Sequence, residues 1–173
     1  MSQRRPNWTL VIKSISYLLL FGFFHFIYQL APSAFSQVIG GTNESIFQHM
    51  KMAVFSYSLV SIGEYFINRK WNPGLSKFFH SRALATVLLP WVIFITWYIV
   101  PAIMNREMPN LAIELTYSII ITYLSGVIAV IQERNFEMLD FSRWMRIINF
   151  ILYFGLIFLL IIFSFEKAVG SFF

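Results

Sequence analysis

The chain has 173 residues, of which 58% are hydrophobic and 19% aromatic, while only 12% are charged. A soluble globular domain carries about 25% charged residues, so this composition leaves too little polar surface to face water. The formal net charge is +5, but the basic residues form short clusters between apolar runs, which excludes the continuous basic face of a nucleic-acid-binding protein. The absence of cysteine excludes disulfides and thiol catalysis.

Several apolar runs have the length of roughly 20 residues that a helix needs to cross the hydrocarbon core of a bilayer. In chain order they are residues 10–30, 50–67, 84–103, 111–131 and 147–165. Each is expected to be a helix, because a backbone group without a hydrogen-bond partner in lipid costs several kcal/mol. We therefore predict an all-α, polytopic transmembrane helix bundle of about five helices, which forms a single integral membrane domain over residues 1–173.

The first run resembles a cleavable signal peptide in its flanks, since Arg4 and Arg5 precede it and Ala31-Pro32-Ser33 follows it. Its apolar part is longer than the roughly 7 to 15 residues of a signal peptide's apolar region. We therefore expect this segment to be retained as the first transmembrane helix.

Lysine and arginine are distributed unequally between the two ends of the predicted helices. Three of the 13 basic residues, Lys51, Arg106 and Lys167, fall on the side opposite the N-terminus. The other side holds Arg4, Arg5, Lys13, Arg69, Lys70, Lys77, Arg82, Arg134, Arg143 and Arg146. The positive-inside rule makes the richer side cytoplasmic, which predicts a multi-pass protein of the cell membrane with its N-terminus inside and its C-terminus outside.

A polar segment lies between the first two runs and reads Asn43-Glu44-Ser45-Ile46-Phe47-Gln48-His49-Met50-Lys51. A glycine pair precedes it, and Thr42 or Asn43 suits the N-cap of the following helix. Glu44 then falls in the first turn, where a negative charge favours the positive end of the helix dipole.

The helical spacing of this segment places Glu44, Gln48 and Lys51 on one face, at positions i, i+4 and i+7. On the predicted topology, the mouth of this helix is extracytoplasmic. His25 near the end of the first helix and Glu114 at the start of the fourth reach the same side. We therefore predict a polar pocket there.

The chemistry of this pocket has more than one reading. A neutral His49 beside Glu44 can transfer protons near neutral pH, so these two are the candidate catalytic residues. Lys51 is a candidate for binding an anionic head group or substrate, although Glu44 and Lys51 equally suit a capping pair at the headgroup level. The candidate ligand-binding residues are Asn43, Glu44, Ser45, His49, Lys51, His25, Glu64 and Glu114.

Glu64 lies on a second polar stripe of the same helix, with Tyr57, Ser61 and Asn68. One reading is a carboxylate that extends to the basic cytoplasmic interface, and the other is a buried proton or cation carrier that faces the bundle.

Some residues of this polar region also have side chains that bind metals. His25, His49 and Glu44 are zinc-ligand types, but no closely spaced histidine pair supports a site, so we predict neither a metal nor a cofactor. A phosphate-binding glycine loop, a nucleophile elbow and a dinucleotide fingerprint are also absent from the sequence.

The polar segment, with His25-Phe26-Ile27-Tyr28 before it and Glu64-Tyr65 after it, resembles a family of small bacterial polytopic membrane proteins of unknown function. An Asn-Glu-Ser, aromatic, acidic, His, x, Lys segment marks that family, although here Phe47 replaces the usual Trp and Gln48 the usual Glu. The resemblance implies a bacterial cell membrane and names no reaction. It draws attention to Glu44, His49, Lys51 and Glu64.

Three functions fit these features. The first is a membrane protein that binds or helps to move a small or lipid-like ligand at the extracytoplasmic pocket. Because about five helices rarely make a complete transporter, this function implies a homo-oligomer or a partner membrane subunit. The second is an intramembrane enzyme acting on a lipid or an envelope precursor, and the third is a structural or regulatory subunit. Whether the protein is an enzyme stays open, and the expected partners include membrane lipids but no nucleic acid.

Overall fold

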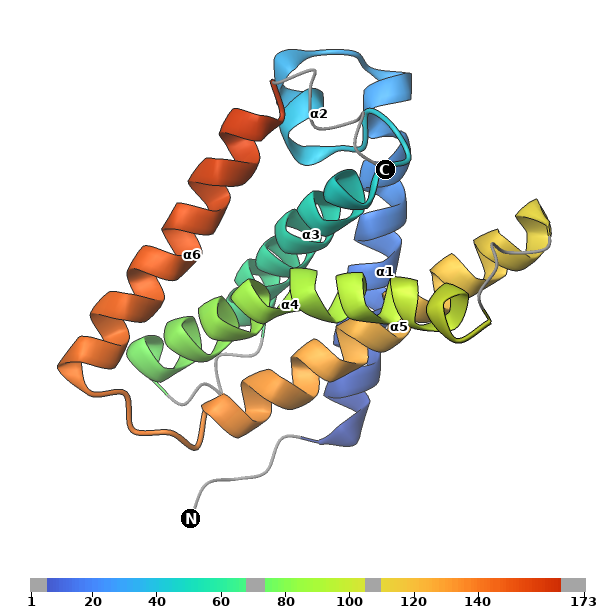
Figure 1. The fold of residues 1–173 in the computed structure, drawn as a ribbon. Helices are drawn as coiled ribbons and strands as arrows, with labels where there is room; N and C mark the ends of the chain where they lie inside the picture. The colour runs from blue at the N-terminus through green and yellow to red at the C-terminus, as the bar shows by residue number, and fades with distance from the viewer. Residues whose placement is uncertain (1–5, 68–73, 105–109, 166–173) are drawn as a thin grey trace.

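Figure 1 shows the computed structural model of the protein, which describes residues 6–67, 74–104 and 110–165. These residues are all-helical, without strands, which confirms the predicted fold class. The helices are α1 (Asn7–Leu30), α2 (Ala34–Ile39), α3 (Ile46–Ile67), α4 (Leu75–Met104), α5 (Leu111–Phe136) and α6 (Arg143–Phe163).

Within the described residues, α1, α4, α5 and α6 are long and apolar enough to cross a membrane. These four helices correspond to the predicted spans 10–30, 84–103, 111–131 and 147–165. The remaining predicted span, 50–67, is the helix α3, which has 22 residues but does not meet the same criterion of hydropathy. The reason is its buried polar side chains, since hydropathy averages all faces of a helix whether they meet lipid or protein. Those side chains are Gln48, Lys51, Ser56, Tyr57 and Ser61.

The bundle is organised around contacts between long helices. The helix α3 packs against both α1 and α4, and α5 packs against the same two helices. Gly126 of α5 permits the contact with α1, because a Cβ atom there would lie 2.5 Å from Cδ1 of Tyr17. Thr122 and Gly126 are buried, as expected for the small-residue face of α5, whereas Ser118 is only partly covered.

The helix α6 packs mainly on α4 and presents much of its apolar surface outward, where lipid solvates such side chains. Polar contacts attach both of its ends. Near its start, Asn149 donates from Nδ2 to the backbone oxygen of His80 at 2.7 Å. Just beyond its end, the backbone oxygen of Ser164 accepts a hydrogen bond of 2.8 Å from Gln37.

Candidate functional site

Two histidines and one carboxylate meet at one end of the bundle, and we call this cluster the histidine site: His25, Glu44 and His49. Nε2 of His25 lies 3.4 Å from Oε1 of Glu44, and Nε2 of His49 lies 3.7 Å from Oε2. One potential ligand atom from each of the three residues lies within 4.8 Å of the others. The sequence predicted that these residues would share a pocket, and the structure brings them together.

The loop that carries Glu44 is held against α1 by a close backbone approach. The backbone nitrogen of Gly41 donates to the oxygen of Phe24 at 3.1 Å. A Cβ atom at Gly40 would lie 2.9 Å from that oxygen and 2.4 Å from Cγ2 of Ile27, so only glycine fits there without a shift. The glycine pair in the sequence is therefore explained by this contact, which brings the loop to the turn of α1 that carries His25.

Hydrogen bonding and stacking fix the ring of His49. Its Nδ1 donates to the backbone oxygen of Ser45 at 2.9 Å, so in the neutral ring Nε2 keeps its lone pair. Trp97 of α4 stacks on the same ring, with 5.6 Å between centroids and 27° between planes. Asn43 accepts from the nitrogen of Ser45 at 3.0 Å and so shapes the loop. The side chain of Glu44, by contrast, is 73% exposed, which leaves the site open on one side.

The N-cap predicted for α3, Thr42 or Asn43, is wrong by a few residues. The helix begins at Ile46, so Glu44 precedes it and does not share a helical face with Gln48 and Lys51. Asn43 forms a turn within the loop rather than an N-cap. Ser45 takes the N-cap position instead, because its backbone oxygen accepts the first hydrogen bonds of the helix, from the nitrogens of Gln48 and His49.

Lys51 and Glu114 occupy places different from the predicted pocket. The side chain of Lys51 is fully buried, and its ammonium group donates to the backbone oxygen of Gln37 at 2.7 Å. Gln37 lies in the last turn of α2, where a nearby cation satisfies a free carbonyl and interacts favourably with the helix dipole. The contact between Lys51 and Gln37 is therefore structural. Glu114 lies exposed in the first turn of α5 and is not part of the three-residue cluster.

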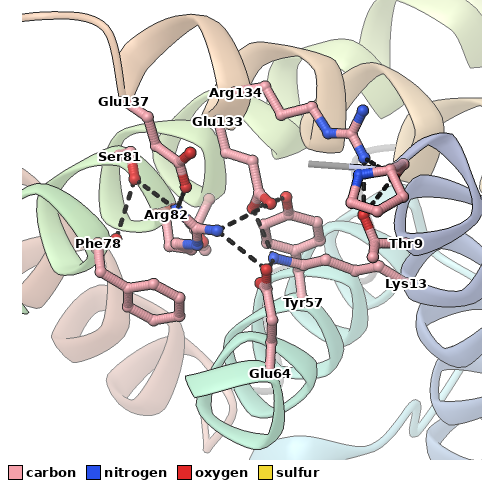
Figure 2. A network of polar contacts seen from close by, with 12 residues as sticks. Thr9, Lys13, Tyr57, Glu64, Phe78, Ser81, Arg82, Glu133, Arg134 and Glu137 are labelled. Atoms are coloured by element: carbon pink, nitrogen blue, oxygen red, sulfur yellow. Dashed lines mark hydrogen bonds and ion pairs between the residues drawn. The ribbon is translucent and has the colours of Figure 1, made fainter. Parts of the chain in front are cut away.

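A second polar cluster lies at the opposite end of the long helices, and we call it the ionic network (Figure 2). The ammonium group of Lys13 contacts Glu64 at 2.6 Å and Glu133 at 2.5 Å. Arg82 contacts Glu64 at 3.0 Å and Glu133 at 3.3 Å. The network consists of Lys13, Tyr57, Glu64, Arg82, Glu133 and Glu137, where Tyr57 donates to Glu133 at 2.5 Å and Arg82 pairs with Glu137.

The ionic network is buried and joins α1, α3, α4 and α5. The exposed fractions of the side chains are 5% for Lys13, 8% for Glu64, 4% for Arg82 and 1% for Glu133. Glu64 is therefore buried between Lys13 and Arg82, as expected of a residue that faces the bundle, whereas its role as a proton or cation carrier stays a prediction. Because removing one partner of a buried ion pair strands the other, the network ties the four helices together.

Sequence reasoning missed most of the ionic network. Lys13 and Arg82 were counted only as cytoplasmic basic residues, and Glu133 lay just beyond the predicted end of its helix at residue 131. The sequence could have indicated Glu133 if the predicted helix had been continued beyond residue 131. Glu133 then follows Gly126 by seven residues and lies on the same face of the helix.

A surface ion pair near the network provides a contrast. Lys77 donates to Asp140 at 2.7 Å, and the carboxylate of Asp140 is 94% exposed. The hydrogen bond and the charge of Lys77 lower the pKa of Asp140 below its ordinary value. Water screens this pair, so it contributes little to stability.

A groove of about 390 Å³ lies beside the network, between α3, α4 and the middle of α6. Its walls are mostly apolar, with Phe78, Phe79 and Phe154 among the lining residues and Arg82 at the network side. Such an apolar lining suits hydrocarbon, whereas the expectation that lipids are partners stays a prediction.

Comparison of the sequence with protein-family models and with curated proteins, and of the chain with solved structures, finds no match. The family resemblance, which covers roughly residues 20–68, therefore stays a prediction.

Proposed function

We propose that the chain is a multi-pass protein of the cell membrane that binds a small or lipid-like ligand at the histidine site, on the extracytoplasmic side. One observation carries the proposal: His25, Glu44 and His49 come from separate segments and converge at 3.4 and 3.7 Å while Glu44 stays 73% exposed. Convergent polar groups at an open mouth, fixed by packing, are the features of a binding site.

The position of the two clusters supports this orientation. Lys13 and His25 are twelve residues apart on α1, which corresponds to about 18 Å along a helix. The ionic network thus lies toward the end rich in lysine and arginine, which the positive-inside rule places in the cytoplasm. The histidine site lies toward the other end. On this proposal α3 also spans the bilayer, because α1 and α4 shield its polar side chains from lipid.

The ionic network has a supporting role in this proposal. It fastens α1, α3, α4 and α5 at the cytoplasmic end, so that His25, His49 and Trp97 at the far ends of three of these helices keep their relative positions. Because the chain is small, a homo-oligomer or a partner subunit completes any path across the membrane.

A second candidate function is an acid and base catalyst that acts on a lipid or an envelope precursor. The contact of 3.7 Å between Glu44 and His49 favours it, because a carboxylate beside an imidazole suits proton transfer. Among the described residues, the hydroxyls of Ser33 and Ser36 bond locally within the start of α2, so neither is paired with this imidazole as a nucleophile.

The test is native mass spectrometry of the protein extracted from bacterial membranes in mild detergent. We expect a bound small molecule or lipid in the wild-type protein that is lost in Glu44→Gln and in His49→Ala. Asp140→Asn is the matched control, since it removes an exposed carboxylate outside the site. If both site variants retain the same bound species as the wild-type protein, the proposed function is wrong.

A further inference from the structure

We infer that the histidine site binds a divalent transition metal ion, with Zn²⁺ as the best fit. The inference rests on the proposed ligand-binding role of this site and names the ligand. Two imidazole nitrogens and a carboxylate oxygen form a three-ligand set that leaves a fourth position for water or substrate, as in open zinc sites. His25, Glu44 and His49 provide this set.

The distances between the ligand atoms fit a tetrahedral ion. Zinc binds nitrogen at about 2.0 to 2.1 Å and carboxylate oxygen at a similar distance, so two ligands of one ion lie about 3.4 Å apart. Nε2 of His25 and Oε1 of Glu44 lie 3.4 Å apart, and Nε2 of His49 and Oε2 of Glu44 lie 3.7 Å apart. These two contacts reach different oxygens of Glu44, and the three donor atoms lie within 4.8 Å of one another. One ion therefore requires rotation of the carboxylate and side-chain movements of about 1 Å.

The surroundings of His49 are those of a metal ligand. A metal-binding histidine usually donates its other ring nitrogen to a carbonyl or a carboxylate, which fixes the tautomer and the direction of the ring. Here Nδ1 of His49 donates to the backbone oxygen of Ser45 at 2.9 Å, and Trp97 stacks on the ring. Nε2 is then directed toward Glu44 with its lone pair available.

The donor types select among metals. Mg²⁺ and Ca²⁺ prefer sites made only of oxygen, and Cu⁺ prefers sulfur, which this cysteine-free chain offers only as methionine. Imidazole with carboxylate suits Zn²⁺ and its neighbours in the first transition series. Since Glu44 is 73% exposed, an ion reaches the site directly from solution and exchanges with it.

The competing explanation is a metal-free cluster in which Glu44 only forms ion pairs with protonated imidazoles. The two explanations differ in how they respond to added metal. A site for Zn²⁺ weakens on acidification, because the ion competes with protons for imidazoles whose ordinary pKa is about 6.5. A metal-free cluster does not respond to Zn²⁺ at any pH.

The experiment uses the full chain in detergent, without a polyhistidine tag, after treatment with a chelator. Isothermal titration with ZnCl₂ measures affinity and stoichiometry, and a titration with CoCl₂ records the visible absorption of the bound ion. The site variants are Glu44→Gln, which changes an exposed residue and leaves the fold intact, and His49→Ala. The matched control is His80→Ala. His80 lies in α4, and its shorter contact with Asn149, at 2.7 Å, uses the backbone oxygen, whereas its ring contacts the same amide at 3.5 Å.

We expect one Zn²⁺ per chain in the wild-type protein and in His80→Ala, with an affinity lower by more than about tenfold in both site variants. We also expect weaker binding at about pH 5.5 than at about pH 7.5. The inference is overturned if the wild-type protein binds no Zn²⁺, or if Glu44→Gln and His49→Ala bind it as the wild-type protein does. If Zn²⁺ fails to bind while the site variants still lose a co-purified organic molecule, the metal inference falls and the proposed function stands.

Discussion

Replacing Glu133 with glutamine tests whether the ionic network holds the helices together. The carboxylate is 1% exposed and contacts Lys13 at 2.5 Å, Tyr57 at 2.5 Å and Arg82 at 3.3 Å. Glu133→Gln keeps the shape and removes the charge. Breaking a buried ion pair by removing one partner costs roughly 3 to 5 kcal/mol. Because the amide oxygen of glutamine still accepts one hydrogen bond, we expect the lower end, about 3 kcal/mol.

The assay is unfolding by SDS in mixed micelles, followed by circular dichroism, with Asp140→Asn as the control. Asp140 has the same kind of contact, 2.7 Å to Lys77, but its carboxylate is exposed, so we expect no measurable change in the control.

A double-mutant cycle with Lys13→Met then isolates the contact between Lys13 and Glu133. The double variant should lose less stability than the sum of the two single variants, by at least about 1 kcal/mol. The reasoning is refuted if Glu133→Gln is as stable as Asp140→Asn, or if the two losses add to within about 0.5 kcal/mol.

Two further predictions follow from local contacts. Gly126→Ala should destabilise the protein by about 1 to 3 kcal/mol in the same SDS assay, because the new methyl group would lie 2.5 Å from the ring of Tyr17. The control Gly22→Ala, which has open space around it, should be neutral or slightly stabilising. Equal effects of the two substitutions would contradict the close contact. Lys77→Ala should raise the pKa of Asp140 toward its ordinary value, as measured by the ¹³C shift of this carboxyl in selectively labelled protein; an unchanged pKa would contradict the pairing. Because folding lowers the pKa of Asp140, the ion pair with Lys77 makes a small contribution to stability that is present above the pKa of the unfolded chain. This contribution is lost as the pH falls through the pKa of the folded protein. Lys77→Ala should remove this pH dependence of stability.

Composition and hydropathy predicted the fold class because the bilayer fixes both the length and the form of a spanning segment. The same reasoning counted α3 as a span, although among the described long helices α3 does not reach the hydropathy typical of a membrane span. Its polar stripe with Tyr57, Ser61 and Glu64 was visible in the sequence, and the structure shows that Tyr57 and Ser61 are buried.

The histidine site was predicted in part. The sequence identified Glu44, His49 and His25, because polar groups near a membrane segment are costly and rare. It misplaced Lys51, because the periodicity argument assumed that the helix begins before Glu44, whereas the helix begins at Ile46. Helix boundaries are the least certain part of such reasoning, and a shift of a few residues changes which side chains share a face.

The ionic network could not be predicted as a unit. Its members come from four helices, and the sequence does not determine which helices are neighbours. Lys13 is the clearest case. The sequence predicts it as a cytoplasmic cation, whereas its burial depends on Glu133, which lies 120 residues further along the chain. Only the packing of α1 against α5 makes that contact.

The orientation of the bundle is the central claim, and the lack of cysteine in the chain makes it directly measurable. Single cysteines are introduced by Glu44→Cys at the histidine site and by Asp140→Cys in the loop between α5 and α6, both at exposed side chains. Spheroplasts are treated with a membrane-impermeant maleimide before and after permeabilisation. We predict that position 44 reacts in intact spheroplasts and that position 140 reacts only after permeabilisation. The reverse pattern would place the histidine site in the cytosol and contradict the proposed function.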